Sequence, residues 1–331
     1  MLGVAFGRLR LGFWHRDTKG DPPVVDGVGS WGAVVPWIGG GDVSSDLFPR
    51  LREIWDLLVA KRGDDPAQQQ RQHQFGGLFD GTPDDDHPVS LRGTKRKIFS
   101  HIEAVLAELD PGSWERLREH LVLWFARKDE RRGWEQALNR LNEAKAYVYL
   151  FKLFRATPSF VPKSKGKTPD LMVEYDDELI LCEVKTINRS DETVDKESSN
   201  DVLSVSRYLP EGFLVKLRRT LESSERQLEK FRKNNSRNVR KFVYFVVNFD
   251  DYSHEYAYEY MEQILVFLNR LHHNKIPEID RIIFNVYPPF YTATSIGPPP
   301  QIYEYEPGDE DTWWFCSISP DMSGGSGSES V

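Results

Sequence analysis

Hydrophobic positions in the C-terminal two thirds of the chain change their spacing in a regular order. Helical spacing comes first, and it then alternates with apolar runs that are rich in β-branched and aromatic residues. The predicted elements are a helix over 134–155, a β-hairpin made of LMVEYDD and ELILCEVKTI, a helix over 213–233, a strand over 241–249, a helix over 255–272, and late strands in RIIFNVY and TWWFCSI. This order predicts an α/β domain with a mixed sheet over residues 131–320.

The chain before this domain has a different character. Residues 1–130 are predicted to form a mainly helical region. Helices are expected at 47–62, 95–109 and 113–128. Ser113 follows an Asp-Pro-Gly turn and is the expected cap of the last helix. The polar stretch 63–93 is expected to be a flexible loop, and residues 321–331 a disordered tail.

Charge and cysteine content narrow the class of protein only slightly. The chain has 43 Lys and Arg against 51 Asp and Glu, a net charge of −8. This balance argues against a nucleic-acid coat protein but not against an enzyme with a local basic face. Cys182 and Cys316 lack the spacing of zinc ligands or of a disulfide framework, so both are expected to be reduced core residues. No apolar run approaches the length of a membrane span, and the default expectation is a cytoplasmic protein.

The second strand of the predicted hairpin carries two charged residues in an otherwise apolar segment, LILCEVKTI. Because side chains alternate along a strand, Glu183 and Lys185 project to one face and Val184 to the other. Burying such charges is unfavourable unless they are paired or bind a metal. A turn centred near Asp177 places Asp170 opposite Val184 and Lys185, so that two carboxylates converge. Converging carboxylates suit Mg²⁺ or Mn²⁺, which prefer oxygen ligands.

Pro169-Asp170 followed by Glu183-Val184-Lys185 resembles the motif of the PD-(D/E)xK, or restriction-endonuclease-like, nuclease superfamily. The resemblance implies a restriction-endonuclease-like mixed β-sheet core flanked by helices, with an α-helical N-terminal extension. It also implies roles for the motif residues. Asp170 and Glu183 bind Mg²⁺ or Mn²⁺, the Val184 carbonyl contributes to the metal site, and Lys185 orients or activates the attacking water.

Two further positions match the superfamily less closely. Many members carry an acidic residue on the helix before the hairpin, and Glu143 occupies that place as a fourth candidate catalytic residue. The alternative is that Glu143 is a solvated helix glutamate. Gln227 and Phe231 are loosely similar to a Gln-x-x-x-Tyr element of the exonuclease branch. Phenylalanine lacks the phenol hydroxyl, so Gln227 is interpreted as structural.

The helix predicted after the hairpin opens the most basic stretch of the chain. Residues 216–241 contain ten Lys or Arg against three Glu. Contact with a nucleic-acid backbone is one interpretation, and an ordinary solvated face is the other. The candidate contacts on this helix are Lys216, Arg218, Arg219, Arg226 and Lys230. Further candidates lie just before the Pro-Asp pair at Lys163, Lys165 and Lys167.

Two functions are compatible with these observations. The first is a Mg²⁺-dependent nuclease that hydrolyses phosphodiester bonds, with DNA as the expected substrate and restriction or defence as a role. The second is a catalytically inactive nuclease-like module that binds nucleic acid or scaffolds a complex. A protein partner or a homodimer fits either function. The sequence leaves open DNA or RNA, and endonuclease or exonuclease.

Overall fold

The structure is a computed structural model of the full chain. It describes residues 48–62, 99, 101–126, 130–162, 168–187, 207–233, 237–248, 256–273, 278–287, 301–307 and 314–316. The loop predicted at 63–93, the tail at 321–331, the side chain of Cys316 and the lysines at 163, 165 and 167 lie outside these residues.

Seven strands form one mixed sheet, and their order in the sheet is their order along the chain. The strands are β1 (Ser159–Phe160), β2 (Leu171–Tyr175), β3 (Glu178–Ile187), β4 (Asn238–Asn248), β5 (Arg281–Tyr287), β6 (Gln301–Tyr305) and β7 (Trp314–Cys316). Strands β3, β4 and β5 are parallel to one another, while the pairs on either side of them are antiparallel. The α/β class with a mixed sheet is therefore confirmed, and β1 and β6 are additions that the sequence pattern did not predict.

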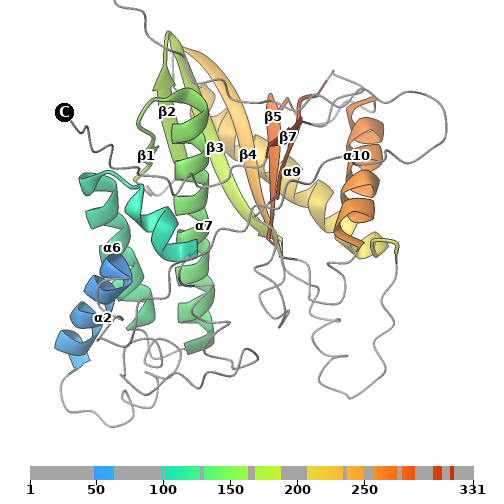
Figure 1. The fold of residues 1–331 in the computed structure, drawn as a ribbon. Helices are drawn as coiled ribbons and strands as arrows, with labels where there is room; N and C mark the ends of the chain where they lie inside the picture. Colours follow the sequence, from blue (N-terminus) through green and yellow to red (C-terminus); the bar gives the residue numbers. More distant parts are fainter. Residues whose placement is uncertain are drawn as a thin grey trace, which may run out of the picture.

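The helices lie on both faces of the sheet (Figure 1). They are α2 (Pro49–Arg62), α6 (Pro111–Phe125), α7 (Glu130–Phe154), α9 (Glu211–Arg232) and α10 (Ala257–His273). In Figure 1, α2 and α6 lie at the lower left, α7 runs beside β2 and β3, and α9 and α10 lie on the other side of the sheet. These elements correspond to the helices predicted at 47–62, 113–128, 134–155, 213–233 and 255–272, with ends that differ by a few residues.

Alternation along β3 divides its side chains between two hydrophobic cores. Ile180, Cys182 and Val184 belong to the core under α7. Leu179 and Leu181 belong to the core under α9 and α10. Both cores hold fully buried side chains, so β3 is a central strand covered on both faces. The core under α7 continues into α2 and α6, and these helices share it with the sheet.

The cap of α6 differs from the prediction. The carboxylate of Asp110 accepts hydrogen bonds from the backbone N–H groups of Gly112 and Ser113, at 3.0 and 3.1 Å. Asp110 is thus the N-cap, and the expectation that Ser113 caps the helix was wrong. Pro111 occupies the first helical turn, where its missing N–H has no partner to lose. The hydroxyl of Tyr147 also donates to Asp110 at 2.5 Å, which ties α6 to α7.

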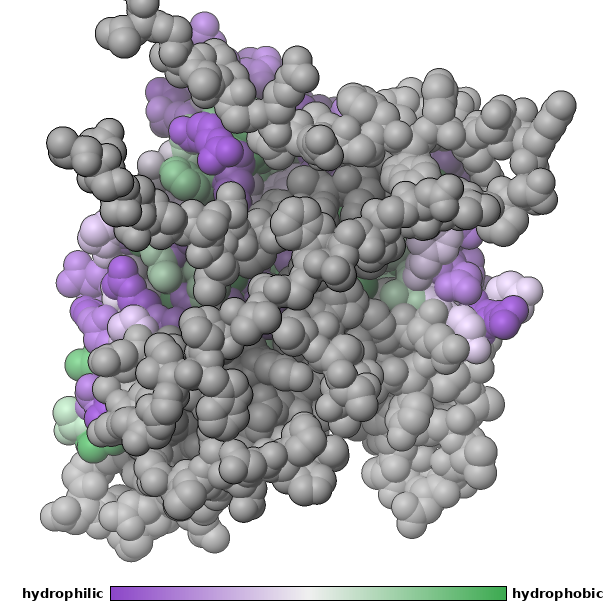
Figure 2. Space-filling model, viewed as in Figure 1, coloured by the Kyte–Doolittle hydropathy of each residue, from purple (hydrophilic) through white to green (hydrophobic). Residues whose placement is uncertain are grey.

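Exposed apolar side chains are scattered over the described surface. Leu57 and Val59 on α2 are 36% and 47% exposed. Hydrophobic colour shows at the corner of Figure 2 where α2 lies. Isolated side chains of this kind are ordinary on protein surfaces. Among the described helices, none has both the length and the apolar character that crossing a bilayer requires.

Candidate active site

The hairpin of β2 and β3 turns through two residues, one of which has a left-handed backbone. Tyr175 pairs with Glu178, so the turn consists of Asp176 and Asp177, and Asp176 has φ of 49°. Aspartate tolerates this conformation better than most residues because its short polar side chain can bond locally. The centre of the turn lies between Asp176 and Asp177, whereas the prediction placed it at Asp177. This difference shifts the pairing of the two strands, so the predicted alignment of Asp170 with positions 184 and 185 was wrong.

Asp170 forms hydrogen bonds with the residues of β3 before and after Glu183. Its backbone N–H donates to the carbonyl of Cys182 at 3.1 Å, and its Oδ2 accepts from the backbone N–H of Val184 at 2.9 Å. The N–H and C=O of one extended residue point to the same side of a strand. The Val184 carbonyl therefore points toward the edge of β3 that Asp170 occupies.

Glu183 and Lys185 project to the face of β3 that α9 covers, as alternation predicted. Lys185 Nζ lies 2.5 Å from Glu183 Oε1. The Glu183 side chain is only 2% exposed, while that of Lys185 is 30% exposed. A buried carboxylate needs a positive or hydrogen-bonding partner, and the partly exposed ammonium supplies one while still facing solvent.

A residue from α9 completes the surroundings of this carboxylate. Gln227 Nε2 donates to Glu183 Oε2 at 2.5 Å and to the Thr168 carbonyl at 2.6 Å. The sequence interpretation gave Gln227 no part in the site. The only signal in the sequence was the loose Gln-x-x-x-aromatic spacing, which was set aside because of Phe231. The contact joins α9 both to β3 and to the segment that leads into Asp170.

The pKa of the nearby Cys182 thiol is affected by the charged residues of the hairpin. Burial raises the pKa of Cys182 well above its ordinary value, and the carboxylates of Asp170 and Glu183 raise it further. Cys182 is a free, buried cysteine that faces the core under α7, as predicted. Both carboxylates thus act on one buried atom of β3, and the thiol stays protonated at neutral pH.

Glu143 lies on α7, on the other face of the sheet. It is 5% exposed, and its carboxylate pairs with Arg140 at 2.5 Å. The adjacent Asn142 donates to Thr186 Oγ1 at 2.9 Å, so this part of α7 lies against the end of β3. Among the described residues, no group of three or more His, Cys, Asp or Glu could hold a metal. Glu143 therefore does not join Asp170 and Glu183 in such a group, and its catalytic role stays a prediction.

The donor set of the hairpin fits a hard divalent cation. Asp170 and Glu183 are the carboxylates of this segment, and Asp170 Oδ2 accepts a hydrogen bond from the backbone N–H of Val184. Magnesium is usually held by one or two carboxylates, keeps several waters and accepts substrate phosphate oxygens, so it does not require a third acid. These three residues would hold the ion. In the structure, Lys185 and Gln227 occupy the two oxygens of Glu183.

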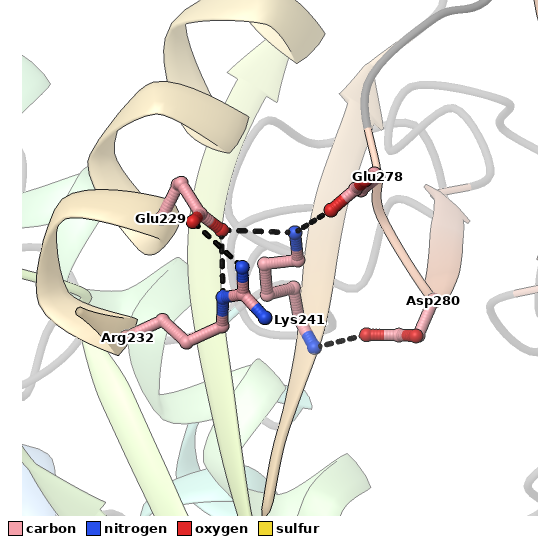
Figure 3. Close-up of polar contacts among 5 residues, drawn as sticks. All are labelled: Glu229, Arg232, Lys241, Glu278 and Asp280. Atoms are coloured by element: carbon pink, nitrogen blue, oxygen red, sulfur yellow. Dashed lines mark hydrogen bonds and ion pairs between the residues drawn. The ribbon is translucent and has the colours of Figure 1, made fainter. Parts of the chain in front are cut away.

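The basic stretch 216–241 is only partly an exposed basic surface. Lys216, Arg218, Arg219, Arg226 and Lys230 are all exposed on α9. Lys241, counted in the same basic stretch, is 4% exposed and lies on β4 between Glu229 and Glu278 (Figure 3). It is therefore unavailable to a nucleic acid, and including it overstated the basic surface.

Known proteins offer no further guide to this site. No protein-family model, no curated protein and no solved structure matches the chain.

Proposed function

We propose that the chain is a metal-dependent nuclease of the PD-(D/E)xK type that hydrolyses phosphodiester bonds, with DNA as the expected substrate. The observation that carries the proposal is a set of contacts around the buried Glu183. Asp170 is hydrogen-bonded to the residues before and after Glu183, and Lys185 contacts the Glu183 carboxylate. A mixed sheet with helices on both faces agrees with the restriction-endonuclease-like fold that the motif implies.

Each side chain has a distinct part in the proposed reaction. A bound Mg²⁺ would supply an acidified water and would neutralise charge on the phosphate. Asp170 and Glu183 would hold the ion, and the hydrogen bond from Gln227 fixes the orientation of the Glu183 carboxylate. Lys185 is a partly exposed cation paired with Glu183, and its proposed part is to orient the attacking water or stabilise charge on the phosphate.

The direct experiment offers several nucleic acids to the full chain. Plasmid, linear duplex and single-stranded DNA and RNA are each incubated with Mg²⁺ or with EDTA. Cleavage of at least one that requires Mg²⁺ and disappears in Lys185→Ala supports the proposal. Lys152→Ala is the matched control, because Lys152 is a partly buried lysine paired with Glu108 away from the hairpin. Absence of metal-dependent cleavage of all four substrates would count against a nuclease.

One observation favours the second candidate, an inactive nuclease-like module that binds nucleic acid. Both oxygens of Glu183 already have partners in the chain, and no third acid joins the pair among the described residues. Such a module would bind nucleic acid without Mg²⁺. Calorimetric titration with Mg²⁺ separates the two candidates, because the nuclease requires binding that Asp170→Asn removes, whereas the module requires none.

A further inference from the structure

The surface of α9 carries two neighbouring rows of charged residues. Residues three or four positions apart share one side of a helix. The first row, called here the mixed row, consists of Arg218, Glu222, Glu225, Glu229 and Arg232. The second, called here the basic row, consists of Lys216, Arg219, Ser223, Arg226 and Lys230. The buried side of the helix consists of Leu217, Leu221, Ser224 and Leu228.

The mixed row is neutralised from within the protein. Arg218 binds Glu222 at 2.9 Å, and Arg232 binds Glu229 at 2.8 Å. Hydrogen bonding from Arg232, followed by Lys241, lowers the pKa of Glu229. Figure 3 shows Glu229 and Arg232 on α9 beside Lys241 of β4.

The same cluster extends to the segment that leads into β5. The Lys241 ammonium lies 3.5 Å from Glu278, and the Lys241 backbone N–H donates to Asp280 at 2.6 Å. The mixed row thus ends in contacts that join α9 to β4 and to residues 278–280. Its two arginines are each paired with a glutamate of the same row.

The basic row differs in composition and in position. It contains four cations and no carboxylate. Gln227, which binds the buried Glu183, lies next to this row: it is three residues before Lys230 and four after Ser223. The row therefore runs along the side of α9 that borders the candidate active site.

We infer that the basic row is a track for several consecutive phosphates of one nucleic-acid strand. The strand would run toward Glu183, and this part of the inference rests on the proposed function. From Lys216 to Lys230 the helix rises about 21 Å. Consecutive phosphates of one strand are about 3.4 Å apart along the axis of a duplex and farther apart along the strand itself, so the row spans several of them. The ligand is therefore a polynucleotide and not a mononucleotide. Arg218, which the sequence suggested as a contact, belongs to the mixed row and is not part of this track.

Binding measured without cleavage tests this assignment. Fluorescence anisotropy records the affinity of the full chain for a labelled 20-residue oligonucleotide, single-stranded or duplex, in EDTA or Ca²⁺ and at several salt concentrations. The test variant is Arg219→Gln with Arg226→Gln. The matched control is Arg232→Gln with Arg237→Gln, which removes the same charge from arginines that are 44% and 54% exposed and paired with Glu229 and Glu174.

The expected result is a loss of affinity of about tenfold or more in the test variant, with a salt slope smaller by about two. The control stays within about twofold of the wild type. Equal losses in the two variants, no loss in either, or a wild type that binds no oligonucleotide would each overturn the inference. A preference of the wild type for anionic lipid vesicles over the oligonucleotide would do the same. A wild type that shows the expected binding but never cleaves removes the proposed nuclease and leaves the basic row intact.

Discussion

Gln227 donates its side-chain amide to Glu183 across 44 positions of sequence, at a donor–acceptor distance of 2.5 Å. One residue belongs to a surface helix and the other to β3, a strand covered on both faces. The contact makes the orientation of a buried carboxylate depend on the packing of α9 against β3. Residues that orient a metal ligand in this way commonly matter nearly as much as the ligand itself.

Gln227→Ala is expected to lower Mg²⁺ affinity or the rate of cleavage about 10- to 100-fold, because Glu183 loses the partner that orients it. Mg²⁺ titration by calorimetry and cleavage kinetics measure the effect. Gln263→Ala is the control, since the Gln263 amide bonds the backbone at Arg207 and Leu209, away from the hairpin. A change in thermal stability with unchanged Mg²⁺ binding and cleavage would show that Gln227 is structural only.

Lys185→Met is expected to abolish cleavage and to destabilise the fold. The substitution leaves Glu183 buried without its cation, but the Lys185 side chain is 30% exposed and the pair is partly screened by solvent. The expected loss in the free energy of unfolding is therefore about 1 to 2 kcal/mol, less than for a fully buried pair. Urea denaturation measures it. A stability equal to wild type would mean that the ion pair with Glu183 contributes nothing to folding.

Asp110→Ala is expected to lower the free energy of unfolding by about 1 kcal/mol at neutral pH, more than Ser113→Ala does. Burial alone would raise the pKa of Asp110, but hydrogen bonds from Ser113, Tyr147 and Gly112 lower it overall. A lowered carboxyl pKa contributes stability above its unfolded value and loses it as the pH falls through the folded one. The difference between wild type and Asp110→Ala should therefore shrink below about pH 4. A difference that is constant from pH 7 to pH 3 would contradict the argument.

Lys145 is expected to make stability rise between pH 7 and pH 10. It is partly buried on α7, and burial lowers the pKa of its ammonium to about 7. Above that pH the folded chain holds this lysine neutral, while the unfolded chain still binds the proton up to its ordinary pKa. Stability thus increases as the pH rises through this window. Lys145→Met should flatten the increase and stabilise the protein at pH 6, as measured by urea denaturation at each pH. An unchanged profile would rule out a lowered pKa.

Local patterns predicted most of the elements, because helices and buried strands leave periodic traces in the sequence. They failed where the trace was too short or ambiguous. The strand β1 has two residues, and the alternation of β6 includes Glu304, which is buried against Arg281. The error in the pairing of β2 with β3 arose at Tyr175–Glu178, where the sequence was equally compatible with two neighbouring turn centres.

The motif predicted the centre of the candidate site but not its surroundings. Glu183 and Lys185 lie two positions apart on β3, so strand alternation sufficed to place them on one face, whereas the turn centre read from the sequence misplaced Asp170 along β3. The contact of Gln227 with Glu183 depends on how α9 packs against β3, and the loose Gln-x-x-x-aromatic spacing was too weak a signal to predict it. The burial of Lys241 depends in the same way on Glu229 and Glu278.

The most direct test of the proposed nuclease is a single-turnover cleavage assay with Asp170→Asn beside Asp177→Asn. The two substitutions are chemically identical and lie in the same hairpin, but Asp177 is an exposed residue of the turn. We predict that wild type and Asp177→Asn cleave nucleic acid with the same dependence on Mg²⁺ concentration. Asp170→Asn is expected to lose cleavage by about a hundredfold or more, as expected when a metal ligand is removed. Equal cleavage by the two variants, or cleavage by wild type in EDTA, would contradict the proposed nuclease.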